Sequence, residues 1–264
     1  MKVTDLFIYP IKSIQAHRLV ESLVQPEGLT FDRQFMLTEP DGKFITARKD
    51  PELYHFSAYP IPQGLFVRHK DGSQIWVHYA DFSQLQQTEV WGSEFPSYVA
   101  NSMLNQWFSE KMGRTVQLRW LGEQSQRRIK RFPENSVSFA DGYPLLLCTE
   151  TSLNGLQQHC PDPIQMTQFR PNLVIDGITA LEEHQWQEIQ VGEVRFLNGK
   201  SSVRCTLTTR DPASNQLNAR MEPYRTLKKV SKDADGQPIF GINLIPLNAG
   251  VIKVGDEVRV LSYR

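Results

Sequence analysis

One cysteine of the chain lies in a segment rich in charged and hydroxyl side chains. In VRCTLTTRDP, residues 203–212, Cys205 follows Arg204 directly, and three threonines, Arg210 and Asp211 come after it. A neighbouring positive charge favours the thiolate over the thiol, and the thiolate is the form that attacks electrophiles or binds soft metals. A small apolar residue buried in a strand is the alternative interpretation, and these residues alone do not exclude it.

Two further segments carry side chains that suit an anion. YPIKS, residues 9–13, reads as a strand that ends at a proline turn and presents Lys12 and Ser13. In QFRPNLVI, Arg170 and Asn172 lie two residues apart, so on an extended strand both would project to the same side. Arginine grips a phosphate through two charge-assisted hydrogen bonds, lysine adds a point charge, and asparagine pairs with the edge of a heterocycle. For Arg170, a surface salt bridge is the alternative.

Composition and charge narrow the class of protein. The 264 residues include 29 Lys+Arg and 29 Asp+Glu, which gives a formal net charge of zero, and 40% of the residues are hydrophobic. A neutral chain lacks the long-range positive field of a dedicated nucleic-acid binder, so we expect no nucleic-acid partner and only local anion sites. The motifs GxGxxG, GxxxxGKS/T, HExxH, GxSxG and CxxC do not occur, which disfavours nucleotide binding and zinc hydrolysis.

The sequence carries no signal for a membrane or for secretion. No segment approaches the ~20 consecutive apolar residues that cross a bilayer, and the first residues lack the apolar core and cleavage site of a signal peptide. The three cysteines cannot all pair within one chain, and none forms the closely spaced pair of a structural zinc site. We therefore expect no membrane association, a cytoplasmic location and at least one free thiol.

Short β-type runs separated by turns fill the first part of the chain. Turns at 40–42 and 71–72 divide an antiparallel meander, whose runs are LFIYPI, FDRQFML, KFITA, LFVRH and QIWVHY. Between Ser97 and Met112 the apolar residues fall at helical spacing, and Gly113 is placed to stop that helix. The meander is therefore expected to lead into a helix.

The second half of the chain begins with a polar stretch. GEQSQRRIKRFPENS, residues 122–136, is expected to form a long surface loop near a domain boundary. This stretch contains four basic residues: Arg127, Arg128, Lys130 and Arg131. They would steer an acidic redox partner, and the alternative is an ordinary solvated face. YPLLLCTE then predicts a buried strand, and Thr149 is placed to cap a short helix that runs to about His159. The remainder is expected to be mostly β.

Eight motifs in a fixed order carry a family resemblance that extends over essentially the whole chain. These motifs are YPIKS, FDRQFML, FITARKDPEL, FADGYPLLLCTETSLNGL, FRPNLVI, RCTLTTRDP, EPYRTLK and VIKVGDEVRVL. Together they resemble the MOSC-domain proteins, which take their name from the C-terminal domain of molybdenum cofactor sulfurase. Within that superfamily, the order of the motifs is similar to the amidoxime-reducing branch, which reduces N-hydroxylated compounds.

The resemblance implies a fold and a place for a cofactor. It implies a β-rich α+β protein, with a MOSC-associated N-terminal β domain over residues 1–120 and a MOSC β-barrel-like domain over residues 121–264. It also places the cofactor in the crevice between these domains, and clefts between domains are common ligand sites.

The resemblance further implies a molybdenum enzyme. Its metal is held by the dithiolene of molybdopterin, by oxo ligands and by a protein cysteine, so Cys205 is implied as catalytic residue and metal ligand. A thiolate suits the soft centre that two dithiolene sulfurs create. Arg48 in the ITARKDP motif is a further candidate for lining the site. The family's cofactor-holding positions fall on Lys12, Ser13, Arg33, Thr149, Arg170, Asn172 and Arg204.

The implied reaction is the removal of oxygen from a small N-hydroxylated substrate, such as an N-hydroxy base analogue or an amidoxime. No residue is assigned as the general acid; water or Asp211 could fill that role. Two alternatives to this reductase stay open. In the first, the protein carries the molybdenum cofactor or transfers sulfur through a Cys205 persulfide. In the second, it is a β-barrel ligand binder with an inert cysteine.

The electron supply departs from a common bacterial arrangement, in which a plant-type iron–sulfur domain follows the MOSC region. Cys148 and Cys160 lack the spacing of such a site, so we expect no iron–sulfur cluster in this chain. Electrons would come from a separate ferredoxin-type or flavoprotein-type donor, or the chain is a fragment of a longer polypeptide. The family also commonly carries another cysteine just before the RC pair, where this chain has Ser201, Ser202 and Val203.

Overall fold

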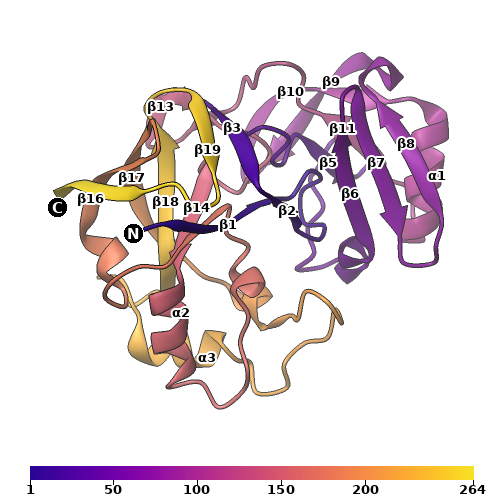
Figure 1. Cartoon of the computed structure of the whole chain (residues 1–264). Coiled ribbons are helices and arrows are strands. Elements are labelled where there is room, and N and C mark those ends of the chain that lie inside the picture. Colours follow the sequence, from indigo (N-terminus) through magenta and orange to yellow (C-terminus); the bar gives the residue numbers. More distant parts are fainter. The chain divides into compact units, whose positions relative to one another are not determined.

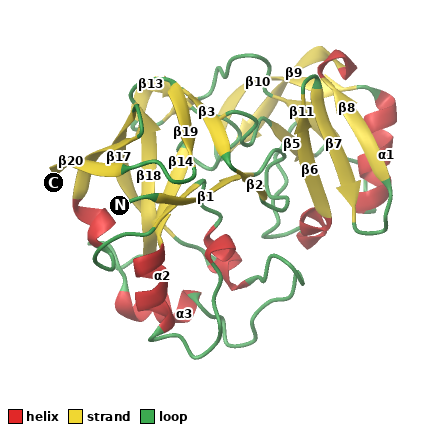
Figure 2. Ribbon diagram, viewed as in Figure 1, coloured by secondary structure: helices red, strands yellow, loops and turns green.

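The computed structural model describes residues 1–264, which fold into two compact units. Unit 1 comprises Met1–Phe7, Arg18–Thr30 and Tyr143–Arg264, and unit 2 comprises Ile8–His17 and Phe31–Gly142. Strands dominate the secondary structure of both units (Figure 1, Figure 2). The predicted β-rich α+β class is therefore confirmed, whereas the domain boundary at residue 120 stays a prediction.

Unit 2 is built from antiparallel sheets. One sheet has the order β5 (Phe35–Thr38), β11 (Gln117–Trp120), β10 (Ser93–Ala100) and β9 (Phe82–Val90). A second sheet has the order β6 (Phe56–Ile61), β7 (Gly64–His69) and β8 (Gln74–His78). A hairpin joins β12 (Arg128–Ile129) to β13 (Phe132–Ser136). The helix α1 (Ser102–Met112) packs on β11, and short 3-10 turns cover Pro51–His55 and Tyr79–Asp81.

The predicted helix before Gly113 is confirmed, but it begins later than its apolar spacing indicates. Val99 pairs with Arg119 in the β10–β11 ladder, so the chain is still extended at residue 99. The Asn101 side chain accepts a hydrogen bond from Leu104 N at 3.0 Å, which caps the helix and fixes its start. Gly113 ends the helix in a left-handed conformation with φ 65, as expected.

Two other predictions for this part of the chain are wrong. KFITA forms no continuous strand: Lys43 pairs with Glu89 and Phe44 with Thr38 in isolated bridges, because its consecutive residues pair with two different partners. Residues 122–136 are not a long surface loop, since they contain the β12–β13 hairpin. Arg127 is only 4% exposed and its guanidinium donates to the backbone carbonyls of Ser138 and Asp141, so it cannot belong to an exposed steering patch.

Unit 1 is organised around one sheet of eight strands. Its order is β2 (His17–Leu19), β1 (Val3–Ile8), β15 (Leu173–Ile175), β14 (Leu145–Thr149), β18 (Ile239–Pro246), β17 (Val194–Val203), β16 (Trp186–Val191) and β20 (Val258–Tyr263). The pair β14–β15 is parallel, whereas β14 and β18 run antiparallel. Every residue of β14 is buried, which confirms the strand predicted from YPLLLCTE. A smaller sheet has the order β19 (Gly250–Lys253), β3 (Glu21–Gln25) and β4 (Gly28–Leu29).

Two α-helices and three 3-10 turns connect the strands of unit 1. The helix α2 (Glu150–Gln157) starts where β14 ends, with Thr149 as its cap as predicted, and α3 (Tyr224–Val230) packs beside it (Figure 1). Three 3-10 turns are η3 (Met166–Phe169), η4 (Glu182–Gln185) and η5 (Thr206–Thr209). Neither α1, α2 nor α3 has the length and apolar character that a helix needs to span a membrane.

The β7–β8 hairpin offers a matched pair of glycines for a stability test. A Cβ added at Gly64, where φ is +146, would lie 1.9 Å from the backbone oxygen of Val77. A Cβ at Gly72, in the turn of the same hairpin, meets nothing within 4 Å, although φ is +89. We expect Gly72→Ala to lower the free energy of unfolding by about 1 kcal/mol, and Gly64→Ala to lower it by about 3 kcal/mol or more. Urea unfolding of both variants checks this, and equal losses would show that β7 and β8 are not in this register.

Candidate functional site

Cys205 is the accessible thiol of the chain. It follows β17, immediately before η5, and its side chain is partly exposed, whereas Cys148 and Cys160 are buried. Burial raises the pKa of the Cys148 thiol far above its usual range and also raises the pKa of Cys160. A thiol must reach its reaction partner before it can bind a metal or attack an electrophile, so Cys205 alone meets that requirement.

The threonines after Cys205 hold the backbone of its turn. The Thr208 backbone N and Oγ1 both donate to the carbonyl of Cys205, at 3.2 and 3.0 Å. Thr209 Oγ1 donates to the Thr206 carbonyl at 2.7 Å, and Gln168 Nε2 donates to the Thr208 carbonyl at 2.9 Å. The hydroxyls that the sequence places beside the thiol are therefore used to fix its position.

Arg204 is anchored to η3 and to the start of β18. Its Nη2 donates to the carbonyl of Phe169 at 2.7 Å, its Nη1 donates to Ser202 Oγ at 2.9 Å, and its backbone N donates to the Pro238 carbonyl at 2.8 Å. The guanidinium carbon lies 5.8 Å from the centre of the Phe169 ring. Unit 1 thus brings Arg204 and Cys205 to the end of η3, where Arg170 follows Phe169.

Arg170 and Asn172 do not share an extended strand, so that expectation is wrong. Arg170 takes a left-handed conformation with φ 57 at the end of η3, and β15 begins only at residue 173. Asn172 is 1% exposed; its Oδ1 accepts from Leu146 N at 3.2 Å and its Nδ2 donates to the Phe7 carbonyl at 3.1 Å. The Asn172 amide therefore ties β14 to β1, five residues before Lys12.

Thr149 is 1% exposed, and its hydroxyl serves the start of α2. Thr149 Oγ1 accepts from Ser152 N at 3.0 Å and donates to Ser152 Oγ at 2.8 Å. Ser152 Oγ in turn donates to Glu183 Oε2 at 2.8 Å. Sequence reasoning missed Glu183, because the polar run EEHQ looks like an exposed turn, yet this carboxyl is 0% exposed. Burial raises the pKa of Glu183 to about 7.

In unit 2, Lys12 forms a largely buried ion pair. Its side chain is 5% exposed, and Nζ donates to Asp141 Oδ1 at 2.5 Å and to the Phe139 carbonyl at 2.7 Å. Burial lowers the pKa of Lys12 to about 8, with Arg127 and Arg33 acting in the same direction and Asp141 opposing them. Lys12 is therefore one of several cations crowded into the same part of unit 2.

Asp141 accepts hydrogen bonds from three side chains of unit 2: Lys12, Arg48 and Trp91. Arg48 Nη2 donates to its Oδ2 at 3.0 Å and Trp91 Nε1 to its Oδ1 at 3.1 Å, while the Arg48 guanidinium carbon lies 4.7 Å from the centre of the Trp91 ring. Loss of water around its oxygens would raise the pKa of Asp141, but Lys12 and Arg48 hold it below its usual range. Sequence reasoning missed Asp141, although it lies in the FADGYP motif that carries the family resemblance.

Arg33 is held by Tyr9 and Asp32. Its Nη1 donates to Asp32 Oδ2 at 2.6 Å, and its guanidinium carbon lies 4.1 Å from the centre of the Tyr9 ring. Asp32 is 1% exposed and also accepts from the backbone N of Tyr9 at 2.9 Å. The charge of Arg33 is thus fixed against the YPIKS segment, to which Lys12 belongs.

Three of the residues predicted to bind the cofactor share an unusual backbone conformation. Ser13, Arg33 and Arg170 have φ values of 72, 47 and 57. Residues other than glycine adopt positive φ rarely, at a cost of about 1 to 3 kcal/mol each, and such residues cluster at functional sites. Five residues outside the predicted cofactor-binding set also have positive φ, so this conformation does not by itself identify the site: Phe31, Trp91, Leu181, Asn215 and Met221.

The donor set fits a metal that brings most of its own ligands. No group of three or more His, Cys, Asp and Glu side chains is arranged to hold a metal ion. In unit 1, Cys205 offers one accessible thiol, so a soft metal bound there would need most of its ligands from an organic cofactor. In unit 2, the cations Lys12, Arg33 and Arg48 are paired with the carboxylates of Asp141 and Asp32.

Comparison with known proteins defines the class. Residues 1–115 match the MOSC N-terminal beta barrel domain and residues 134–259 match the MOSC domain. The chain therefore belongs to the MOSC-domain proteins, and the family resemblance of its motifs is confirmed.

Individual proteins and one solved structure are similar to this chain. The chain is 29% identical to mitochondrial amidoxime reducing component 2 of Macaca fascicularis over 276 residues, 97% of this chain and 82% of that protein. It is 28% identical to molybdenum cofactor sulfurase of Oryza sativa subsp. japonica over 265 residues, 91% of this chain but 32% of that protein. The solved YuaD protein of Bacillus subtilis covers 97% of this chain and 93% of its own, with a TM-score of 0.48 and 12% identity.

The Lys12–Asp141 pair yields a test with a defined pH dependence. Asp141→Asn leaves the buried ammonium without this counter-charge, and we expect the free energy of unfolding at pH 7 to fall by about 1 to 2 kcal/mol. The loss is smaller than for a fully buried pair because 57% of the Asp141 side chain is exposed. It should shrink as the pH rises through about 8, the pKa of Lys12, because a neutral amine needs no counter-charge.

Chemical unfolding between pH 6 and about 10 measures this loss. Asp71→Asn, which removes an exposed pair with Lys111, is the matched control and should show no step near pH 8. A loss for Asp141→Asn that stays constant through pH 8 would contradict the buried ion pair.

Glu183 yields a second pH test. Its pKa is raised from 4.5 to about 7, so the unfolded chain ionises first as the pH rises. The stability that the neutral carboxyl contributes is present below pH 4.5 and lost as the pH rises through about 7, by up to about 3 kcal/mol. Glu183→Gln cannot ionise and should abolish this fall, whereas the neighbouring Glu182→Gln should retain it. Unfolding curves recorded from pH 4 to about 8 decide between these outcomes.

Proposed function

We propose that this protein is a molybdenum-cofactor-dependent reductase that removes oxygen from small N-hydroxylated substrates. The observation that carries the proposal is the accessible Cys205, fixed by Arg204 and Thr208 in a MOSC domain whose other two thiols are buried. The similarity to an amidoxime reducing component supports the reaction class. The balanced reaction takes an amidoxime, two electrons and two protons to an amidine and water.

Cys205 is the proposed protein ligand of the metal. Its thiolate would complete the coordination of a soft centre, and the Arg204 anchor keeps the residue at the end of η3. When bound, the molybdenum cofactor supplies the two-electron oxygen-atom chemistry, which no side chain of this chain provides. The protein's own contribution is to bind and orient the cofactor and to tune its charge.

The cations of unit 2 are the proposed phosphate-binding groups. Burial lowers the pKa of Lys12, and the nearby positive charges of Arg127 and Arg33 lower it further. An anion beside these groups would relieve that repulsion, and Arg48 lies on the same carboxylate as Lys12. Four further residues complete the proposed cofactor-binding set: Ser13, Thr149, Arg170 and Asn172.

A second candidate function follows from the similarity to a molybdenum cofactor sulfurase. In that case the protein would carry the cofactor or transfer sulfur through a persulfide on Cys205. The two functions differ in turnover, because only the reductase converts an N-hydroxylated base to its amine with a chemical electron donor. For the reductase, we propose a separate ferredoxin-type or flavoprotein-type donor and a location in the cytoplasm.

Cys205→Ser tests the ligand assignment. We expect the variant, purified from a host that makes the cofactor, to lose nearly all its molybdenum and its reductase activity, because a serine hydroxyl does not replace a soft thiolate ligand. Metal content is measured by mass spectrometry, pterin by fluorescence, and turnover with an N-hydroxylated purine and reduced viologen.

Cys160→Ser is the matched control and should retain molybdenum, since the Cys160 thiol is buried. Unchanged metal content in Cys205→Ser, with an unchanged circular dichroism spectrum, would remove Cys205 as the ligand. Wild-type protein that holds molybdenum and pterin but shows no turnover would favour the carrier.

A further inference from the structure

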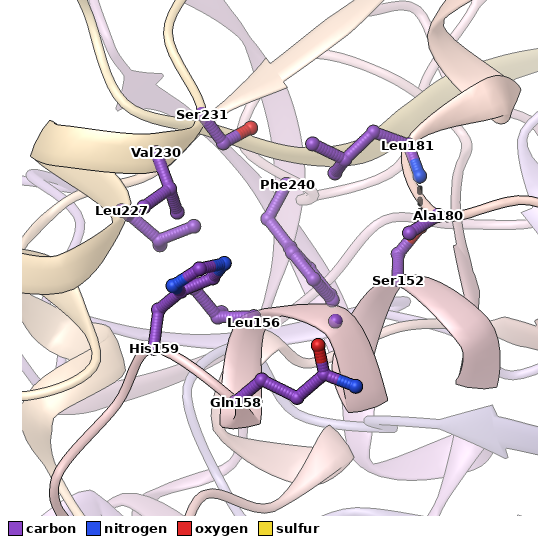
Figure 3. Close-up of a pocket in the computed structure, with 11 residues that line it drawn as sticks. Ser152, Leu156, Gln158, His159, Ala180, Leu181, Leu227, Val230, Ser231 and Phe240 are labelled. Carbon is purple, nitrogen blue, oxygen red and sulfur yellow. Dashed lines mark hydrogen bonds between the residues drawn. The ribbon is translucent and has the colours of Figure 1, made fainter.

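Unit 1 contains a cavity of about 240 Å³ that no residue predicted to bind the cofactor lines (Figure 3). Its wall is formed by α2, the loop at residues 180–181, α3 and β18. Leu156, Leu227 and Phe240 form its depth and are 4%, 0% and 0% exposed. The exposed side chains of Gln158 and His159 lie at its mouth.

The chemistry of the wall defines the ligand. No Asp, Glu, Lys or Arg side chain lines the cavity, so a charged ligand would lose its hydration without compensation. The two buried serines already donate hydrogen bonds, Ser152 to Glu183 Oε2 and Ser231 to the Ile239 carbonyl, both at 2.8 Å. A ligand must therefore be neutral and mostly apolar, with any polar group directed at the mouth.

The volume sets the size of that ligand. An apolar cavity of about 150 Å³ takes up benzene. The present cavity is larger, at about 240 Å³, and its depth is lined by Leu and Phe side chains. Two fused planar rings with one N–H, as in indole, match this volume and lining, and the N–H would face the polar groups at the mouth.

The cavity wall also contacts the anchor of Cys205. The Phe240 ring stacks on Phe169, with ring centres 4.0 Å apart. The Phe169 carbonyl accepts from Arg204 Nη2 at 2.7 Å, and the Arg204 backbone N donates to Pro238, two residues before Phe240. A ligand that shifts Phe240 would therefore act on two of the three contacts that anchor Arg204, the residue next to Cys205.

We propose that this cavity is an effector site for a small neutral bicyclic aromatic molecule, and that its occupancy changes the exposure of the Cys205 thiol. The proposal does not depend on the reaction at Cys205, because both parts of it are properties of the full chain without cofactor. Its ligand differs from the phosphate-bearing cofactor in charge, and its lining residues are different.

Indole binding to the full-length chain tests the site. We expect saturable binding by isothermal titration, with methyl shifts at Leu156 and Leu227 in NMR spectra. Ala180→Trp, on the rim of the cavity, should weaken binding by about tenfold or more because its ring fills the mouth. Ile178→Trp is the matched control: residue 178 is 74% exposed, does not line the cavity and should leave affinity unchanged.

Alkylation of Cys205 tests the coupling. Iodoacetamide labelling of the cofactor-free chain, followed by peptide mass spectrometry, should proceed at a rate that saturating indole changes by about twofold or more. The buried Cys148 and Cys160 serve as internal references. Absence of saturable binding, or an equal loss of affinity in both tryptophan variants, would overturn the site. Binding with an unchanged Cys205 labelling rate would overturn its role as an effector site.

Discussion

The hydrogen bond from the Arg204 guanidinium to the Phe169 carbonyl is the contact on which the geometry around Cys205 depends. It joins the end of β17 to the end of η3, two segments far apart in the sequence, at a distance of 2.7 Å. Charge-assisted bonds of this kind are roughly twice as strong as neutral ones. With this bond in place, Cys205 starts a turn held by its own threonines, and Arg170 leaves η3 in a left-handed conformation. The position of the partly exposed Cys205 thiol thus depends on Arg204, a cation that is itself partly buried.

The two units differ in how they place their polar and charged side chains. Unit 1 presents a thiol to its surroundings and uses its polar side chains to brace the backbone, as Asn172 does between β14 and β1. Unit 2 withdraws cations from water and holds Lys12 against Asp141, with Arg127 fixed on backbone carbonyls. Burial of cations costs free energy unless carbonyls or carboxylates replace water. In unit 2, Asp141 and the backbone carbonyls of Phe139 and Ser138 offset this cost for Lys12 and Arg127.

Local signals in the sequence predict local structure well. Gly113 ends α1 and Thr149 caps α2 because each acts on backbone within four residues of itself. The polar residues around Cys205 in the sequence also favour an accessible thiol, and Cys205 is partly exposed in the structure. By contrast, Arg127 reads as part of a charged loop, and only the fold shows that carbonyls of Ser138 and Asp141 surround it.

Glu183 and Asp141 escape sequence reasoning for the same reason. Their partners, Ser152 and Lys12, come from distant segments, so no spacing reveals them. The left-handed residues are equally invisible, because Ser13, Arg33 and Arg170 are not residue types that favour positive φ. Ser13, Arg33 and Arg170 lie in the family motifs, but their backbone conformation is set by tertiary contacts that a motif does not reveal.

The path of the chain through the two units has a consequence for biosynthesis. The main segment of unit 2, Phe31–Gly142, lies in the sequence between the first strands of unit 1 and its last segment, Tyr143–Arg264. During translation, β1 and β3 leave the ribosome long before their partners β15 and β19 exist, so their edges stay unsatisfied while unit 2 is completed. Closing pairs of such high sequence separation is slow. Nascent chains paused after residue 142 would therefore expose the strand edges of β1 and β3 that later pair with β15 and β19, and unpaired edges are natural targets for chaperones.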